Sequence, residues 1–287
     1  MKTGLVLEGG ALRTIFSSGV CDAFLDLDLP MPDYTIGVSA GLAYGVSYLS
    51  RQARRNLKLV TTYANDPRYM SLRNLANPKN RSYFGLDFSY REIPDHLIPF
   101  DYDALARYPG EAEAVVTNLD TGRADYLPID RGHDPEGILQ ATCAMPLLFP
   151  IYHIHGQPYL DGGCADPIPY QRAFDRGCDR VVVILTRERS YVRRREKTEG
   201  LIEHHYRRYP NFVATMRRRT EAYNQCRERL FQLEREGRVL VLSPESTAGY
   251  SRTEKDVEKI RTLWQNGYFD GRRMAVAIRT FWGQDGR

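Results

Sequence analysis

The sequence predicts an α/β fold built from parallel βα units, and three observations support this prediction. A short apolar strand, a glycine-containing turn and an apolar-periodic helix follow one another twice within the first 50 residues. A purely aliphatic run at residues 181–185 has the composition of a buried parallel strand. Hydrophobic residues make up 42% and charged residues 26% of the 287 residues, which is the balance of a globular chain.

The first two βα units are defined by their apolar spacing. Residues 5–7 form a short strand that two glycines end, and apolar side chains at residues 12–27 recur at three- and four-residue steps, as in a helix. Two prolines stop that helix. Residues 34–36 predict the second strand, residues 37–41 a tight turn, and residues 42–49 the second helix.

The rest of the chain continues with hairpins, strands and helices. Residues 65–99 are rich in Asn, Pro, Tyr and Arg and are expected to be irregular, over the edge of the sheet. The further expected elements are hairpins at 114–127 and 152–160, a helix from 138 that Pro146 stops, a strand at 239–242, helical structure over 193–236, and a helix at 253–266 capped by Ser251 or Thr253.

Composition excludes several classes of protein. No stretch approaches the roughly 20 apolar residues of a membrane-spanning helix. The first ten residues include Glu8 and too few apolar residues for a secretory signal, so we expect a cytoplasmic protein. The five cysteines form no CxxC pair, so we expect buried thiols and neither a disulfide framework nor a metal site. No organic cofactor is expected.

The net charge of +4 conceals a local excess of positive charge. Residues 187–235 contain fourteen Lys and Arg against seven acids, whereas the remaining residues sum to −3. We interpret this segment as a solvated helix face with Arg–Glu pairs or as a surface that contacts anionic lipid headgroups. Its aromatic residues are either membrane anchors or a core-facing stripe. No nucleic-acid recognition motif is present, so no nucleic-acid partner is expected.

The sharpest chemical signal is the sequence Gly37-Val38-Ser39-Ala40-Gly41. A GxSxG motif between an apolar strand and a helix is typical of a nucleophile elbow, in which the serine occupies a strained turn and bulky neighbours would clash. The hydroxyl then projects beside a helix N-terminus, where the helix dipole favours negative charge. Ser39 is therefore the candidate nucleophile, and Gly37 and Gly41 are the small residues that its turn needs.

A serine nucleophile also needs amide donors for the oxyanion and a base. The turn Gly9-Gly10-Ala11 can supply N–H groups, and it matches neither common nucleotide-binding glycine motif. Six histidines are available as a base. The alternative base is Asp161, which ends an apolar strand and precedes Gly162 and Gly163. Both possibilities, a Ser–Asp dyad and a triad with a histidine, remain open on the residues alone.

Together these blocks resemble the patatin-like phospholipases, and the bacterial branch of that family in particular. The matching blocks are Gly9-Gly10 followed by Arg13, the GxSxG at Ser39, a stretch at residues 141–150 that ends in a Phe-Pro pair, and Asp161-Gly162-Gly163. Their order and spacing agree with the family from about residue 5 to residue 185. The resemblance implies a three-layer α/β/α fold with a mostly parallel central sheet, as one domain over 1–287 that carries a basic helical insertion at about 187–236.

The resemblance also implies roles for individual residues. Ser39 is the expected nucleophile and Asp161 its base, and the amides of Gly9, Gly10 and Ala11 form the expected oxyanion hole. Arg13 lies near that hole as a candidate substrate contact. The chain departs from the family where Ala11 replaces a third glycine and Thr14 a glycine after the arginine. Alanine keeps its N–H, but a positive φ at residue 11 costs about 1 kcal/mol.

The resemblance predicts a serine acyl-ester hydrolase of the phospholipase A or lysophospholipase type. The expected partner of this hydrolase is a lipid or acyl-ester substrate. We also expect peripheral contact with the anionic inner face of a membrane. The alternative is a lipid-binding regulatory protein with little or no catalysis. We expect the acyl-pocket residues within 65–100 and in the late helices.

Overall fold

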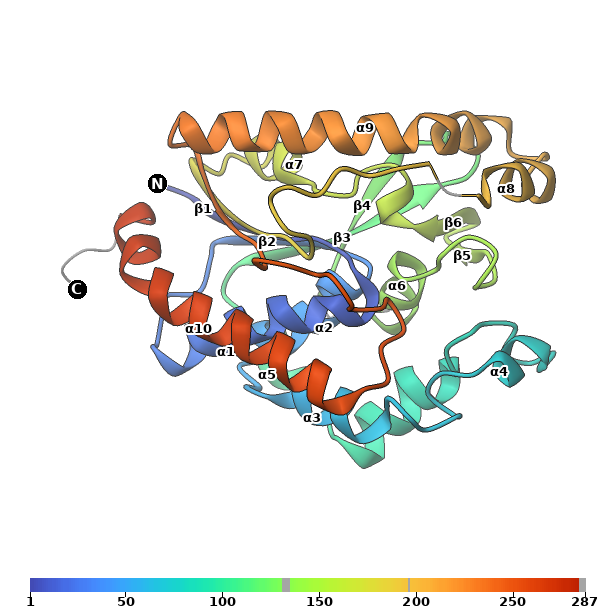
Figure 1. The fold of residues 1–287 in the computed structure, drawn as a ribbon, viewed down its shortest axis with the longest axis horizontal. Coiled ribbons are helices and arrows are strands. Elements are labelled where there is room, and N and C mark those ends of the chain that lie inside the picture. The colour runs from blue at the N-terminus through green and yellow to red at the C-terminus, as the bar shows by residue number, and fades with distance from the viewer. Residues whose placement is uncertain (131–134, 196, 284–287) are drawn as a thin grey trace.

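An eight-stranded mixed sheet separates two layers of helices in the computed structural model, which describes residues 1–130, 135–195 and 197–283 (Figure 1). The strand order is β5-β6-β3-β2-β1-β7-β8, with β4 paired to β3. The strands are β1 (Thr3–Leu7), β2 (Tyr34–Val38), β3 (Glu111–Asn118), β4 (Ala124–Pro128), β5 (Tyr152–Ile154), β6 (Gln157–Asp161), β7 (Arg180–Ile184) and β8 (Val239–Leu242).

The parallel part of the sheet confirms the predicted α/β class. Strands β3, β2, β1, β7 and β8 pair in parallel, and Leu7 of β1 lies opposite Gly37 on one side and Ile184 on the other. Strands β4 and β6 pair antiparallel with β3, and β5 pairs antiparallel with β6. The sheet is therefore mixed, with the expected parallel βα units in one half and two hairpins in the other.

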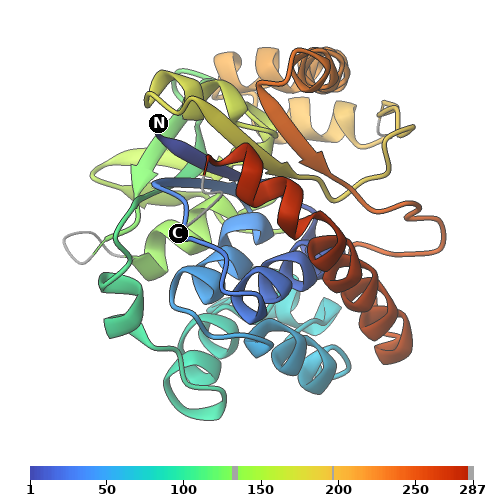
Figure 2. The same ribbon diagram turned by 90° about the vertical axis from the view of Figure 1, so that its left-hand side faces the viewer.

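Helices cover both faces of the sheet, which gives the expected three layers (Figures 1 and 2). Leu5 and Leu7 of β1 belong to the core beneath α1 and α10, whereas Val6 belongs to the core beneath α7 and α9. The helices are α1 (Ile15–Asp26), α2 (Ala40–Leu49), α3 (Arg55–Tyr63), α4 (Leu72–Ala76), α5 (Tyr102–Ala106), α6 (Pro135–Thr142), α7 (Tyr170–Asp175), α8 (Glu199–His205), α9 (Pro210–Arg235) and α10 (Val257–Phe281), with short 3₁₀ turns η1 (Ala11–Thr14) and η3 (Gly162–Cys164) and the π-helix η2 (Phe88–Leu97).

The last helix packs tightly against the first. A Cβ at Gly267 of α10 would lie 2.0 Å from the carbonyl oxygen of Phe16, and one at Gly19 of α1 would lie 2.1 Å from that of Trp264. The two backbones can approach this closely only because both positions lack a side chain. This contact makes the C-terminal part of the chain a component of the same core.

Several element boundaries differ from the sequence predictions. Residues 65–99 are not wholly irregular, because they contain α4 and η2. Helix α6 ends at Thr142, four residues before Pro146, because the chain turns there to approach the sheet. The side chain of Asp256 caps α10, in place of Ser251 or Thr253, by accepting hydrogen bonds from two N–H groups of the first turn. The basic segment becomes helical only from Glu199 onward.

Three aromatic residues of the basic segment face the core. Tyr206, Phe212 and Tyr223 are between 0% and 3% exposed. Their burial removes them as membrane anchors. On the outer side, Arg217 pairs with Glu203 at 2.7 Å, as expected for a solvated helix face. Within the described ranges, none of the helices combines the length and the apolar character that crossing a bilayer requires.

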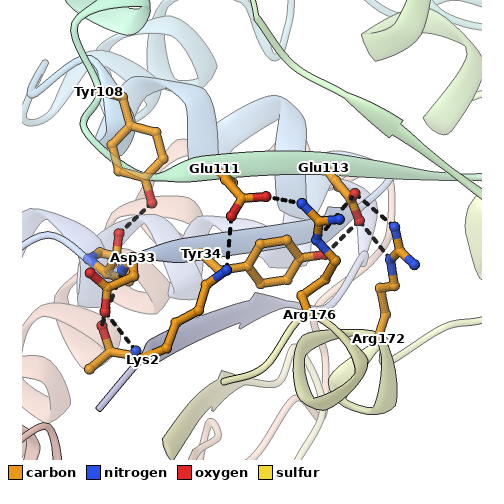
Figure 3. Close-up of polar contacts among 10 residues, drawn as sticks. Lys2, Asp33, Tyr34, Tyr108, Glu111, Glu113, Arg172 and Arg176 are labelled. Atoms are coloured by element: carbon orange, nitrogen blue, oxygen red, sulfur yellow. Dashed lines mark hydrogen bonds and ion pairs between the residues drawn. The ribbon is translucent and has the colours of Figure 1, made fainter. Parts of the chain in front are cut away.

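Ion pairs join the amino ends of the central strands (Figure 3). Buried Glu113 at the start of β3 accepts bonds from Arg172 Nε at 2.8 Å and from the hydroxyl of Tyr34 at 2.6 Å. Glu111 pairs with Lys2 at 2.8 Å and also with Arg176. The cluster connects β1, β2 and β3 to α7 at the edge where these strands begin. Each charged member has an oppositely charged partner within the cluster, so we assign it a structural role.

We expect Glu113→Gln to lower the free energy of unfolding by about 3 kcal/mol, because it leaves Arg172 without its carboxylate in a largely buried position. The matched control Glu111→Gln breaks a more exposed pair and should cost less than about 1 kcal/mol. Urea denaturation at pH 7 measures both values. Equal losses for the two variants would contradict the assignment.

Candidate active site

Ser39 occupies the sharp turn between β2 and α2. Its backbone has φ 54° and ψ −135°, a conformation that costs a non-glycine residue about 1–3 kcal/mol. The N–H of Ser39 donates to the hydroxyl of Thr142 at 2.8 Å, and that hydroxyl donates to the carbonyl of Val115 at 2.6 Å. A Cβ at Gly41 would lie 2.5 Å from the carbonyl oxygen of Leu7. The turn therefore has the strained backbone and the close packing that the GxSxG motif predicts.

Asp161 lies at the end of β6, where the antiparallel pairing with β3 places it opposite Val116. Its carboxylate is 6% exposed and accepts hydrogen bonds from the side chain of Ser39 and, at 2.8 Å, from the N–H of Gly163. A Cβ at Gly162 would lie 2.2 Å from the carbonyl oxygen of Val115, so the turn after Asp161 fits tightly against β3. The structure thus brings together Ser39 and Asp161, which are 122 positions apart in the sequence.

Burial raises the pKa of Asp161 above the ordinary value of an aspartate. The hydrogen bonds from Ser39 and Gly163 and the charges of Arg219 and Arg252 act in the opposite direction. A carboxylate in this environment accepts a proton more readily than one in water. The geometry and the electrostatics both suit a base next to a hydroxyl.

The glycine turn after β1 lies against Ser39. A Cβ at Gly9 would be 2.9 Å from the Cβ of Ser39, and the carbonyl of Gly9 accepts a bond from the hydroxyl of Thr186 at 3.1 Å. Ala11, which stands where the family usually has a third glycine, has a positive φ of 50°. In the described part of the chain, the N–H groups of Gly10 and Ala11 donate to no protein acceptor, which leaves both able to bind a ligand oxygen.

Arg13 lies beneath this turn in η1 and is only 6% exposed. Burial, followed by the charges of Arg187 and Arg252, lowers the pKa of its guanidinium to about 10. Its Nε has no hydrogen-bond partner. Arg13 lines a cavity together with Ser39 and Asp161.

Two cavities meet at Ser39. The first has a volume of about 150 Å³, and its walls are mainly apolar. Its lining includes Tyr44, Tyr69, Phe84, Leu139 and Phe149. This lining comes from η1, the turn at Ser39, α2, the 55–105 segment, α6 and the residues just after α6. None of its described residues belongs to the helices after 187, where part of an acyl pocket was also expected. The second cavity has a volume of about 80 Å³, and seven of its eighteen lining residues are charged, Arg13 and Asp161 among them.

The described histidines lie away from this site. His96 belongs to η2, His153 and His155 to the β5–β6 hairpin, and His204 and His205 to α8. None of these five residues lines either cavity. His133 lies outside the described residues. Among the described residues, no cluster of His, Cys, Asp and Glu side chains is placed to hold a metal ion.

Sequence reasoning missed two supports of the site. Thr142, which holds the N–H of Ser39, lies within the 141–150 stretch, but nothing in its local sequence indicates the contact. The partly buried thiol of Cys143 interacts with the side chains of Ser39 and Tyr90, and desolvation raises its pKa to about 12. Both residues come close to Ser39 only because α6 ends over the carboxyl edge of the sheet.

Comparisons with known proteins agree with this arrangement. The family model described as patatin-like phospholipase matches residues 5–174. A second model, described as a domain of unknown function (DUF6363), matches residues 209–283. The first model therefore includes Ser39, Asp161 and the Gly9–Ala11 turn.

Two individual proteins are similar to the chain. The uncharacterized protein YjjU of Escherichia coli (strain K12) is 26% identical over 202 residues, which cover 64% of this chain and 52% of that protein. The chain thus spans about half the length of this curated relative. The crystal structure of VipD from Legionella pneumophila superposes with a TM-score of 0.48 at 15% identity, covering 96% of this chain and 67% of that one.

Proposed function

The chain belongs to the patatin-like phospholipase family, and from this premise we propose that it is a serine acyl-ester hydrolase that cleaves fatty acyl esters of lipids. The observation that carries the proposal is the strained Ser39, whose side chain is hydrogen-bonded to the buried carboxylate of Asp161 at the meeting point of two cavities. This pairing supplies a nucleophile and a base in contact, which acyl transfer requires.

In the proposed acylation step, the Oγ of Ser39 attacks the ester carbonyl carbon while Asp161 accepts its proton. The carbonyl oxygen becomes an oxyanion, and the N–H groups of Gly10 and Ala11, with that of Gly9, donate to it. The tetrahedral intermediate collapses as the bond to the alcohol breaks. The proton held by Asp161 passes to the departing alkoxide, so the alcohol leaves neutral and the acyl group stays on Ser39.

Deacylation uses the same residues, with a water molecule as the nucleophile. Asp161 removes a proton from a water molecule, and the resulting hydroxide attacks the acyl-enzyme carbonyl. The glycine turn again binds the oxyanion. The fatty acid leaves and the proton returns to the Oγ of Ser39, which restores the free enzyme.

The apolar cavity supports a lipid substrate. An acyl chain in this cavity would remove its surface from water, at about 0.8 kcal/mol for each buried methylene. The cavity reaches Ser39, so a chain inside it would present its carbonyl end to the nucleophile. We therefore assign the acyl chain to this side of Ser39.

The proposal treats residues 1–287 as one cytoplasmic hydrolase domain in which the 187–236 segment is a basic insertion. Strand β8 within the sheet and helix α10 against α1 support this organisation. Exposed Arg194, Arg195 and Arg218 leave positive charge on the outer surface of the insertion. We propose that this surface contacts anionic membranes peripherally.

Ser39→Ala and Asp161→Asn should each lower kcat on p-nitrophenyl butyrate by at least about 10³-fold, because each removes one member of the dyad. A fluorophosphonate probe should modify Ser39 alone, as located by mass spectrometry. The exposed Ser246→Ala serves as the control and should keep wild-type turnover. Wild-type turnover in either dyad variant would overturn the assignment, and vesicle binding without any labelling would favour a non-catalytic lipid-binding protein.

The acid limb of kcat/KM should lie above pH 4. Asp161 works as a base only when ionised, and burial raises its pKa above the ordinary value of about 3.9, so activity is lost as pH falls through that raised pKa. Chromatography of released butyrate measures the profile without relying on an indicator that itself titrates. Circular dichroism at each pH confirms that the protein stays folded. Full activity at pH 4 would refute an Asp161 base of this kind.

The protein should cosediment with vesicles that contain phosphatidylglycerol and much less with pure phosphatidylcholine vesicles. Each exposed arginine near an anionic surface contributes about 1 kcal/mol, so Arg194→Gln and Arg195→Gln should each weaken binding about fivefold. High salt should release the protein, because it screens these charges. Equal binding to both vesicle types would contradict the proposed surface.

A further inference from the structure

The wall of the first cavity contains a group of hydroxyls that the proposed hydrolysis does not use. They belong to Tyr44 of α2, to Tyr69, and to Ser89 and Tyr90 of η2, and we call these four residues the hydroxyl cluster. The rest of the wall is mainly apolar. A buried hydroxyl that gives up water without gaining a partner is unfavourable, so a wall that receives only hydrocarbon gains nothing from such a cluster.

The hydroxyl cluster lies next to the nucleophile. The thiol of Cys143 interacts with the side chain of Ser39 and with the hydroxyl of Tyr90. Tyr44 and Tyr69 are both close enough to Cys143 to interact with it electrostatically. The cluster therefore begins one side chain away from Ser39, at the end of the cavity where the ester carbonyl would lie.

Ser89 has an unused hydrogen-bonding group. Its Oγ is buried and finds no hydrogen-bond partner among the described residues, although Ser89 lines the cavity. Gly85 connects Ser89 to Tyr69, because its N–H donates to the carbonyl of Tyr69 at 3.0 Å and its carbonyl accepts from the N–H of Ser89 at 2.8 Å. A Cβ at Gly85 would lie 1.9 Å from the carbonyl oxygen of Arg68, so these two segments are held in close contact.

The tyrosines of the cluster also have hydrogen-bonding capacity left. The hydroxyls of Tyr44 and Tyr69 bond to each other, and the hydroxyl of Tyr90 bonds to the thiol of Cys143. A hydroxyl carries one proton and two lone pairs. Only one of the two protons of the Tyr44–Tyr69 pair lies between the two oxygens, so the second O–H can donate to a ligand oxygen.

The other polar side chains of this lining, apart from Ser39 and Cys143, are those of Arg55, Asn56, Tyr102 and Glu136. Each of them bonds elsewhere in the protein. Their partners are, in the same order, the carbonyl of Ile98 at 2.8 Å, Ser18 at 3.0 Å, Asp95 at 3.4 Å and Arg91 at 3.0 Å. The hydroxyl cluster is thus the part of the described lining best able to hydrogen-bond a ligand.

We propose that the hydroxyl cluster binds a hydroxyl group on the third carbon of the acyl chain, so that the enzyme prefers 3-hydroxyacyl esters. The inference rests on the proposed function, which places the acyl chain in the first cavity with its carbonyl carbon at Ser39. One methylene separates the carbonyl carbon from the third carbon, as one side chain, that of Cys143, separates Ser39 from the cluster. A ligand hydroxyl can accept a bond from a tyrosine and donate one to Ser89, whereas a plain chain leaves these groups unpaired.

The first experiment compares p-nitrophenyl 3-hydroxybutanoate with p-nitrophenyl 3-methylbutanoate, in which a methyl of similar size replaces the hydroxyl. Each kcat/KM is divided by the rate constant for hydrolysis of the same ester by hydroxide, which removes the inductive effect of the hydroxyl. The corrected ratio should favour the better enantiomer of the 3-hydroxy ester about tenfold. The two enantiomers should differ about fivefold, because a fixed cluster binds the hydroxyl on one side of the chain.

Variants then locate the preference. Tyr69→Phe and Ser89→Ala should each reduce the corrected ratio about tenfold, because each removes a hydrogen bond to the ligand hydroxyl. Tyr152→Phe is the matched control, since the hydroxyl of Tyr152 is also buried without a partner but Tyr152 does not line this cavity. It should leave the ratio unchanged. An unchanged ratio in both Tyr69→Phe and Ser89→Ala would overturn the assignment to the cluster.

The second experiment measures binding without catalysis. 3-Hydroxybutanamide and 3-methylbutanamide are titrated into Ser39→Ala protein, and saturation-transfer NMR gives the Kd of each. The hydroxy amide should bind about tenfold more tightly. Because the methyl amide is the more hydrophobic, an apolar cavity without a hydroxyl site would favour it instead.

The outcomes separate the two proposals. Tighter binding of the hydroxy amide with no hydrolysis of any ester would overturn the hydrolase and leave the hydroxyl site standing. Hydrolysis that depends on Ser39 but shows a corrected ratio of one or less would overturn the hydroxyl site and leave the hydrolase standing. Equal binding of the two amides, or tighter binding of the methyl amide, would also overturn the hydroxyl site.

Discussion

The backbone of Ser39 is held in a positive-φ conformation that an isolated chain would leave, and the geometry of the site depends on this one constraint. Parallel pairing of β1 with β2 sets the end of β2 beside the glycine turn that follows β1. The hydroxyl of Thr142 accepts a hydrogen bond from the N–H of Ser39 and donates one to the carbonyl of Val115 in β3. Because three elements hold the turn, the strain persists and the hydroxyl of Ser39 projects into the space between two cavities.

The charged side chains at the two ends of the central strands are arranged differently. Where β1, β2 and β3 begin, Glu111 and Glu113 pair with Lys2, Arg172 and Arg176, so each charged group has an oppositely charged partner inside the protein (Figure 3). At the edge where these strands end, the arginines around the second cavity exceed the carboxylates that line it. Three of these arginines, Arg187, Arg193 and Arg219, belong to the basic segment, so part of its charge lies beside this cavity.

The elements that the sequence predicts well are those with a strong local pattern. The alternation over residues 5–49 appears as β1, α1, β2 and α2, and the aliphatic run at 181–185 appears as buried strand β7. The predictions fail where tertiary contacts override local preference. Helix α6 ends at Thr142 because its hydroxyl bonds to β3, although Pro146 is the nearest local stop signal. The cap of α10 is Asp256, since its carboxylate reaches two N–H groups that Ser251 and Thr253 do not reach.

From its residues alone, the chain reveals an α/β fold, the GxSxG turn at Ser39, the glycine turn at Gly9 and Gly10, and Asp161 as a candidate base. These features are local, because small residues and apolar spacing act within a few positions of the chain. Only the tertiary structure decides between Asp161 and the described histidines as the neighbour of Ser39, because that choice depends on the antiparallel pairing of β6 with β3. The same holds for the arginines of the second cavity. Their positions span Arg13 to Arg252, and no local pattern predicts that side chains so far apart in sequence converge on one space.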